Sequence, residues 1–165
     1  MNKYLPAVVC GFAAAVLTTI PGIRNFGCCL LVPAAAIFSV IIHQKLLKST
    51  LPIETSEAIV FGLFTGLTAA LFASCFDILL TYISHSNDFV ESLSQAENMW
   101  KSFGSNEIIK ETFVLMNRMA SNIKVSGFST YYTILIFFSN AISYSLFGMI
   151  GGIFGRIVVK RKNKS

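Results

Sequence analysis

Long apolar runs alternate with polar links along this chain, and the runs are long enough to predict transmembrane helices. The hydrocarbon core of a bilayer is about 30 Å thick, so about 20 consecutive apolar residues can cross it as a helix. A helix is required there because it satisfies every backbone hydrogen bond internally. We therefore predict four spanning helices, at about residues 4–20, 27–47, 58–83 and 128–159.

The first two runs are expected to form a tight antiparallel hairpin. The first run ends at Pro21-Gly22, a natural helix stop, and only a short link precedes the second. We expect the first run to be retained rather than cleaved as a signal peptide, because no A-x-A site follows it. Pro33 lies inside the second run, where neighbouring helices are expected to satisfy the carbonyl group that proline leaves unpaired.

Residues 84–127 are polar, and their apolar positions recur with helical spacing. Asp88, with Glu91 three residues later, resembles a capping box at the start of a helix. We predict two amphipathic helices that lie at the membrane surface or on the ends of the spans. Their apolar faces would be Phe89, Leu93, Ala96, Trp100 and Phe103 in the first, and Ile109, Phe113, Met116, Ala120 and Ile123 in the second.

The composition strengthens the prediction of a membrane protein. Hydrophobic residues make up 54% of the 165 residues and charged residues only 13%, whereas a soluble domain carries roughly 25% charged residues. We therefore predict one all-α domain over residues 1–165, an integral membrane four-helix bundle in which the amphipathic segment separates the third and fourth spans.

The distribution of basic residues predicts the orientation of the spans. Lys and Arg collect on the cytoplasmic side, close to the ends of spanning helices. Lys3, Lys45, Lys48 and the bases at the end of the chain would share that side, with both termini cytoplasmic and residues 84–127 outside. The terminal KRKNK is interpreted as an orientation signal, so no nucleic-acid partner is expected.

Glycines at four-residue spacing predict close helix packing. Without side chains, two glycines one turn apart let a second helix backbone approach closely. The alternative is that glycine is simply common in membrane helices. The pairs are Gly62 with Gly66, Gly148 with Gly152, and Gly151 with Gly155.

Asp77 is the candidate polar site within the membrane. An ionised carboxylate at the centre of a bilayer costs about 2.5–3.5 kcal/mol on insertion scales, so it needs a partner, water or a proton. Arg24, in the short link between the first two spans, is the base best placed to reach it, and Ser74, Tyr132 and Thr133 are possible hydrogen-bond donors. The alternative is a carboxylate near the headgroups that is simply wet.

Two further polar residues lie within the spans. Asn140, near the middle of the fourth span, is expected to form an interhelical hydrogen bond rather than a substrate site. His43 lies near the inner end of the second span, beside Gln44 and Lys45. It is expected to be a wet interfacial side chain in the leaflet opposite Asp77.

The chain contains no GxSxG, HExxH, P-loop or GxGxxG motif, and its two histidines are far apart. Its four cysteines lie in or beside apolar runs without a CxxC or zinc-ligand spacing. We therefore predict no enzymatic activity, no metal and no cofactor. We expect a structural or accessory protein, or one that acts by interaction. It would contact the lipid bilayer and a second copy or another membrane protein. The alternative is a small transporter or channel component that uses Asp77 as an ion or proton site.

The order of features resembles a bacterial membrane family, domain of unknown function 4199. The likeness covers about residues 54–162: the glycine-rich ETSEAIVFGLFTGLTAALFA, the acidic SNDFVESLSQAENMW and the final SLFGMIGGIFGRIVVKRK. The chain departs from the family at Asn87-Asp88-Phe89, where an Asp-Pro is expected. The resemblance implies a four-helix protein of the bacterial inner membrane and no assigned activity.

Overall fold

A computed structural model describes residues 3–20, 22–23, 26–47, 53–93 and 107–162, which are almost entirely helical and contain no strand. Residues 88–93 are also helical. The named elements are α1 (Leu5–Thr18), the short π-helix η2 (Gly27–Leu31), α2 (Val32–Leu47), α3 (Thr55–Ser84), α5 (Glu107–Ser126) and α6 (Thr130–Lys162). The all-α prediction is confirmed for these ranges.

The chain divides into two compact units that α3 and α6 both enter. Unit 1 consists of residues 1–76 and 137–165, and unit 2 consists of residues 77–136. Each unit is described by itself below.

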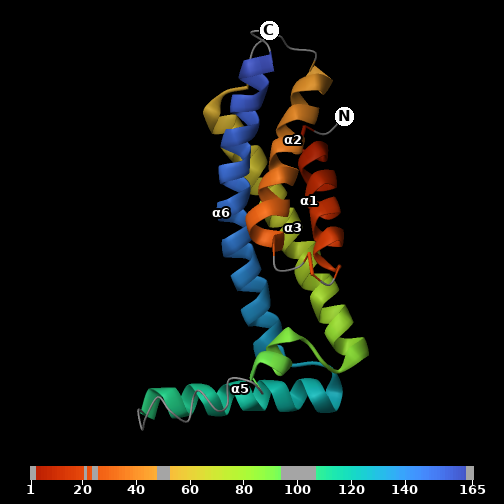
Figure 1. Cartoon of the computed structure of the whole chain (residues 1–165), viewed down its shortest axis with the longest axis vertical. Coiled ribbons are helices and arrows are strands. Elements are labelled where there is room, and N and C mark those ends of the chain that lie inside the picture. The colour runs from red at the N-terminus through yellow and green to blue at the C-terminus, as the bar shows by residue number, and fades with distance from the viewer. Residues whose placement is uncertain (1–2, 21, 24–25, 48–52, 94–106, 163–165) are drawn as a thin grey trace. The chain divides into compact units, whose positions relative to one another are not determined.

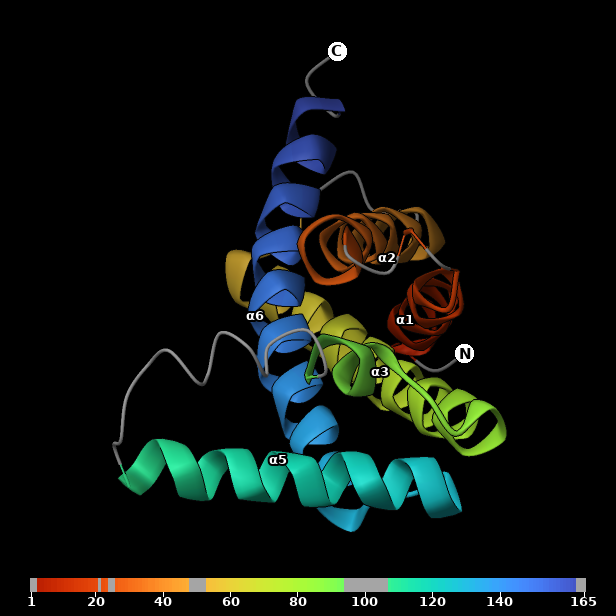
Figure 2. The same ribbon diagram turned by 60° about the horizontal axis from the view of Figure 1, so that its bottom comes forward.

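Unit 1 is a bundle in which α1, α2 and the unit's parts of α3 and α6 lie side by side (Figures 1 and 2). The first residues of α1 and the last residues of α6 lie at the same end of this unit (Figure 1). Small side chains dominate one of its core clusters, which includes Ala14, Ala15, Ala69 and Ala73. Small residues bring helix axes close together, so the bundle is packed through short side chains.

Among the described residues, three helical segments are long and apolar enough to cross a membrane by length and composition. They are Cys29–Leu46, Thr55–Ser84 and Thr130–Arg161. The first apolar run forms a shorter helix than expected, because α1 has 14 residues and is therefore about 21 Å long. In the last turn of this helix, the Thr18 hydroxyl donates to the Ala15 carbonyl at 2.6 Å. Turns then continue to Ile20, just before Pro21.

The second run is not one uniform α-helix. Residues Gly27–Leu31 form a π-helix, and the Val32 amide donates to the Gly27 carbonyl, five residues earlier. Proline cannot donate a hydrogen bond and clashes with the carbonyl four residues before it. The wider π turn precedes α2, so the missing donor of Pro33 falls in the first turn of α2. Pro33 therefore does not interrupt the helix that follows.

Unit 2 contains α5 and a small core of its own. The buried face of α5 carries Met119, Ala120 and Ile123, with Phe113 and Met116 partly buried beside them. This face agrees with the second predicted amphipathic helix. Val90, Leu93 and Tyr132 complete the core. Within the first predicted helix, Ala96, Trp100 and Phe103 lie outside the described residues.

The helix that begins near residue 88 is capped one position earlier than expected. The Asn87 side-chain oxygen accepts from the Val90 amide at 3.0 Å, so Asn87 and not Asp88 is the capping residue. Its amide group also donates to the Thr81 hydroxyl at 3.2 Å. Asn87 is buried, whereas Asp88 is exposed.

Gly127 lies between α5 and α6, and the backbone conformation at this position requires glycine. Its φ of +71° is strained for residues with a side chain, and a Cβ atom there would lie 2.6 Å from the Tyr82 carbonyl oxygen. The turn therefore rests directly on the backbone of α3 within unit 2.

Candidate functional site

Asp77 forms a buried hydrogen bond with Tyr132 in unit 2. The Tyr132 hydroxyl donates to Oδ2 of Asp77 at 2.7 Å, and the two residues are 5% and 8% exposed, respectively. Phe89 covers the tyrosine ring, with ring centroids 5.6 Å apart. Protein rather than water surrounds the carboxylate, so the expectation of a wet Asp77 is wrong. Of the three donors considered from sequence, Tyr132 is the one shown to bond to the carboxylate.

This pair links α3 to α6 in unit 2. A hydrogen bond to an ionised acceptor is roughly twice as strong as one between neutral groups. Removing one partner leaves the other buried without its bond, at a cost of about 1–3 kcal/mol. The geometry therefore gives Asp77 a role in holding two helices together. Arg24 lies outside the described residues, so its expected approach to Asp77 stays a prediction.

Asn140 makes a second interhelical hydrogen bond, in unit 1. Its side-chain nitrogen donates to the Ser74 hydroxyl oxygen at 3.0 Å. Ser74 is fully buried in α3 and Asn140 is partly buried in α6. This is the interhelical bond that was predicted for Asn140, whereas no sequence pattern indicated Ser74 as its partner.

Ser39 is the exception among these buried hydroxyl groups. Its side chain is fully buried in α2, and its Oγ atom has no hydrogen-bond partner. A buried hydroxyl without a partner is destabilising, because it has lost its bonds to water without replacement.

The predicted glycine pairs on α3 and α6 face one another. A Cβ atom added at Gly62 would overlap the Gly148 carbonyl oxygen, and one added at Gly148 would overlap the Gly62 carbonyl oxygen. Gly152 lies in the same way against the Ala58 carbonyl, and Gly66 against the Tyr144 carbonyl. The two backbones therefore touch without intervening side chains. We call these four glycines the α3–α6 seam.

A neighbouring face of α6 packs against α2 in the same manner. A Cβ atom at Gly151 would lie 2.5 Å from the Pro33 carbonyl oxygen and 2.6 Å from its Cα atom. A Cβ atom at Gly155 would lie 3.0 Å from the Cβ atom of Val40 and 3.1 Å from the Cα atom of Ile37. Consecutive glycines at 151 and 152 thus serve two different partner helices.

Gly11 is a packing residue that the sequence reasoning missed. A Cβ atom there would lie 2.6 Å from the Thr65 carbonyl oxygen, so α1 approaches α3 as closely as the other helix pairs approach each other. The sequence does contain a pattern that predicts this contact, because Ala7, Gly11 and Ala15 are small residues at four-residue spacing. Ala7 and Ala15 are both fully buried.

A charged cluster at one end of unit 1 was also missed. Oε1 of Glu57 lies 2.6 Å from Nζ of Lys3 and 3.6 Å from Nε2 of His43. The imidazole of His43 lies against the Phe61 ring, with ring centroids 4.1 Å apart. His43 is only 3% exposed, so the expectation of a wet interfacial histidine is wrong.

The start of α3 explains why this cluster was not foreseen. The helix begins at Thr55, three residues before the expected start at Ala58, and so places Glu57 in its first turn. Glu57 and Phe61 then lie one helical turn apart on one face, where His43 contacts both. The hydrogen bond from the Lys3 ammonium to Glu57 raises the pKa of Lys3 above its ordinary value.

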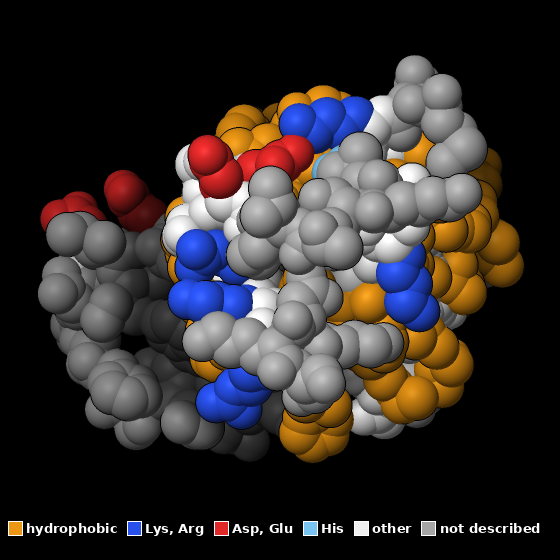
Figure 3. Space-filling model, turned by 90° about the horizontal axis from the view of Figure 1, so that it is seen from above, with side chains coloured by type: hydrophobic (Ala, Val, Ile, Leu, Met, Phe, Trp, Pro, Cys, Tyr) orange, Lys and Arg blue, Asp and Glu red, His pale blue; other side chains and the backbone are white. Residues whose placement is uncertain are grey.

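Figure 3 views this end of unit 1, where basic and acidic side chains gather while hydrophobic side chains cover the flanks. Arg156, near the end of α6, donates from Nε to the Ile53 carbonyl at 3.0 Å. Lys45 is exposed in the last turn of α2. Lys3, just before α1, and the described basic residues of α2 and α6 therefore share one end of the bundle.

Within the described ranges, no group of three or more His, Cys, Asp or Glu side chains is arranged to hold a metal ion. Comparison with known proteins adds no family assignment: no family model, no curated protein and no solved structure matches the chain. The resemblance to domain of unknown function 4199 accordingly stays a prediction.

Proposed function

We propose that this protein is a small multi-pass membrane protein that acts through protein contacts and carries out no chemistry of its own. The observation that carries this proposal is the distribution of side-chain size in unit 1. Many large apolar side chains face outward, whereas most buried residues are small, with Phe61 and Tyr144 among the exceptions. A soluble bundle has the opposite arrangement, because burying its large apolar side chains supplies most of its stability.

The last helix gives the clearest example. Leu146, Ile150 and Phe154 on α6 are 53%, 46% and 55% exposed, whereas Gly148 and Gly152 are buried against α3. Large exposed apolar patches are rare on soluble monomers. Lipid tails are as apolar as leucine, so a lipid environment removes the cost of exposing them and leaves close backbone packing to hold the helices together.

The helix directions support four passes even though α1 is short. The first residues of α1 and the last residues of α6 lie at the same end of unit 1 (Figure 1). Ends that lie on the same side of a membrane require an even number of passes. Four crossing helices meet this requirement. A helix of about 21 Å can be accommodated by local thinning of the bilayer, at a cost of fractions of a kcal/mol for each Å of mismatch.

The charges support an inner-membrane orientation with cytoplasmic termini. Lys3, Lys45, Arg156, Lys160 and Arg161 lie in the first or last turns of unit 1 or just outside them. Basic residues at span ends favour the cytoplasmic side. Residues 84–127 then lie on the outer side, joined to the bundle by α3 and α6.

The proposed role is that of an accessory or structural subunit, assembled with a second copy or another membrane protein. Two described polar pairs join one helix to another, Asp77 with Tyr132 and Asn140 with Ser74. Such bonds contribute to helix association. They leave the outward apolar faces for contact with lipid or with partner helices.

Extraction of cell membranes tests the membrane location. The protein should stay in the membrane pellet after an alkaline carbonate wash and should enter solution only with detergent. A peripheral protein loses its electrostatic attachment in such a wash, whereas a spanning helix does not. Recovery of the protein in the carbonate supernatant would refute the proposal.

A second candidate function is a small transporter or channel component that uses Asp77. One observation favours it: a carboxylate is buried in a helix of the right length and composition to span. Vesicles that contain the purified protein and an internal pH-sensitive dye distinguish the two functions. The accessory role predicts no more proton or cation flux than in empty vesicles. Flux that Asp77→Asn abolishes, with the protein still folded and inserted, would favour the transporter instead.

A further inference from the structure

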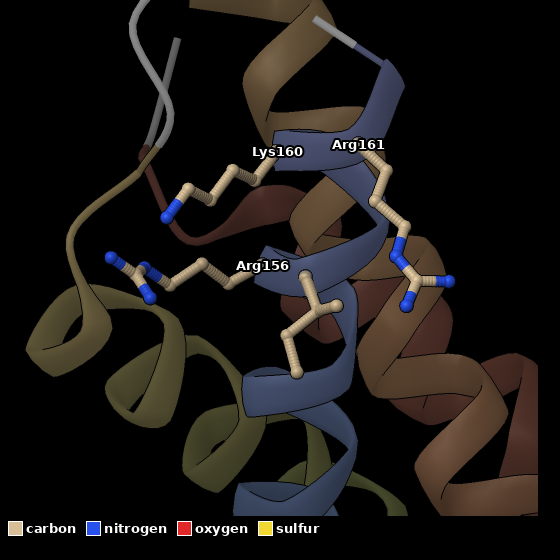
Figure 4. Close-up of a pocket in the computed structure, with 4 residues that line it drawn as sticks. Arg156, Lys160 and Arg161 are labelled. Carbon is tan, nitrogen blue, oxygen red and sulfur yellow. The ribbon is translucent and has the colours of Figure 1, made fainter. Parts of the chain in front are cut away.

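The end of α6 carries a basic pocket that none of the helix contacts described above uses. The pocket has a volume of about 300 Å³ and is lined by Arg156, Ile157, Lys160 and Arg161. Arg156 and Lys160 extend from one side of α6 toward the start of α3, and Arg161 extends from the other side, next to α2 (Figure 4). Three cationic side chains and one apolar side chain thus line the pocket.

Arg156 is held in position by the backbone. Its Nε atom donates to the Ile53 carbonyl at 3.0 Å, and Ile53 is itself buried in a core cluster with Ala58 and Phe61. The bond fixes the plane of the guanidinium group and leaves the two terminal nitrogens as donors. An arginine that is oriented before binding loses less conformational freedom when an oxyanion accepts from it.

The described residues supply no negative charge that pairs with the bases of the pocket. Among the residues that the structure describes, no carboxylate lies within ion-pair distance of Arg156, Lys160 or Arg161. Arg156 and Lys160 are four residues apart on one helix, where like charges destabilise each other. A bound anion would relieve this repulsion and accept several charge-assisted hydrogen bonds at once.

The surroundings of the pocket identify the source of the anion. Ile157 lines the pocket between the bases, and the preceding turn of α6 exposes Ile153 and Phe154, which are 39% and 55% exposed. A charged site that continues into an exposed apolar surface matches a molecule with an anionic head and hydrocarbon chains. Basic pockets at the cytoplasmic ends of spanning helices bind lipid headgroups in this way.

We propose that Arg156 and Lys160 bind the phosphate of an anionic phospholipid, with Arg161 adding positive charge from the other side of α6, and that the acyl chains lie along α6 over Ile153 and Phe154. The site prefers a headgroup with net negative charge. A zwitterionic headgroup would bring its own cation against the three bases. The proposal rests on the membrane location proposed above, since acyl chains are available to α6 only in a bilayer.

A titration in detergent tests the pocket directly. The purified protein is titrated separately with short-chain phosphatidylglycerol, short-chain phosphatidylcholine and inorganic phosphate, and native mass spectrometry measures the bound fraction. Phosphatidylglycerol should bind and raise Tm, whereas the other two ligands should have little effect. An equal effect of inorganic phosphate would overturn the assignment to lipid, and an equal effect of phosphatidylcholine would overturn the preference for anionic headgroups.

Charge-matched double variants separate the pocket from general attraction to anions. Lys160→Gln with Arg161→Gln removes two exposed bases of the pocket. Lys45→Gln with Lys124→Gln removes two exposed bases from the last turns of α2 and α5. Each base near a membrane surface contributes about fivefold to the binding of an anionic lipid. The pocket variant should therefore bind phosphatidylglycerol about 25-fold more weakly, and the control should bind nearly as wild type.

Equal weakening in both double variants would overturn the proposal, because it would mean that net charge alone attracts the lipid. Both variants change exposed side chains, so folding is preserved and can be checked by Tm without lipid. The result of the carbonate wash does not depend on the result of this titration. A protein released by carbonate would refute the proposed function, whereas loss of the difference between the two variants would refute the lipid site.

Discussion

At the scale of single residues, three buried polar groups differ in whether they have a partner. Tyr132 donates to Asp77 and Asn140 donates to Ser74, while the Ser39 hydroxyl has no partner. Burying a polar group is costly unless a hydrogen bond replaces the lost water. Substitutions at these positions should therefore change stability in opposite directions.

Tyr132→Phe should destabilise the protein by about 1–3 kcal/mol, because it leaves the buried Asp77 carboxylate without this donor. Thermal unfolding in detergent measures the loss. Tyr131→Phe is the matched control, since the neighbouring ring is 64% exposed. Asp77→Asn keeps an acceptor oxygen for Tyr132 and should cost less than Tyr132→Phe. Equal changes in Tm for Tyr131→Phe and Tyr132→Phe would contradict this role for the bond.

Ser39→Ala should leave Tm unchanged or raise it, because it removes a buried hydroxyl that has no partner. Ser74→Ala should lower Tm, because it removes the acceptor of Asn140, a bond worth about 0.6 kcal/mol on average between membrane helices. Both serines are fully buried, so each is a control for the other. A drop of the same size in both variants would show that burial alone determines the effect.

At the scale of helices, the α3–α6 seam sets how closely the bundle packs. Its glycines bring the two backbones into direct contact. Inserting atoms into a well-packed interface forces backbone shifts and typically costs about 1–3 kcal/mol. Helix association without a hydrophobic driving force depends strongly on such contacts.

Gly152→Ala should lower the stability of the bundle by about 1–3 kcal/mol, because the new methyl group would overlap the Ala58 carbonyl oxygen. Ser139→Thr also adds one methyl group to α6, at an exposed position, and should have little effect. Tm in detergent compares the two variants. A bundle that tolerates Gly152→Ala as well as Ser139→Thr would not depend on the seam.

The positions of the long helices could be predicted from the sequence, whereas their ends and cross-chain partners could not. A run of apolar residues marks a helix without fixing its last turn, so α1 ends at Thr18 rather than near residue 20, and α3 begins before Ala58. Glycine spacing marks a narrow helix face but not the helix that meets it. The contact of Lys3 with Glu57 joins distant parts of the chain, and nothing in the local pattern of either residue indicates it.

At the scale of the whole molecule, the basic end of unit 1 predicts which side of the membrane each segment occupies. A cysteine at exposed Ser121, in a chain without Cys10, Cys28, Cys29 and Cys75, should react with an impermeant reagent added to intact cells. The reason is that the bases at the ends of the spans hold both termini in the cytoplasm. A cysteine at Lys45 should react only after lysis and serves as the control.

The reverse labelling pattern would mean that the bases lie outside. In that case residues 84–127 would face the cytoplasm, and a cytoplasmic partner for α5 would become the leading hypothesis. The proposed lipid site would then face the outer leaflet. Labelling of both positions in intact cells would contradict a single orientation.

The glycine contacts of α6 also constrain how this sequence can change over evolutionary time. At Gly148 and Gly152 no side chain fits between the helices, so substitution there requires a compensating change on α3. At Ile150 and Phe154, which face outward, one apolar residue can replace another with little consequence. Diverged relatives should therefore keep glycine at these two positions, one turn apart, and exchange Leu, Ile, Val and Phe freely at the outward positions.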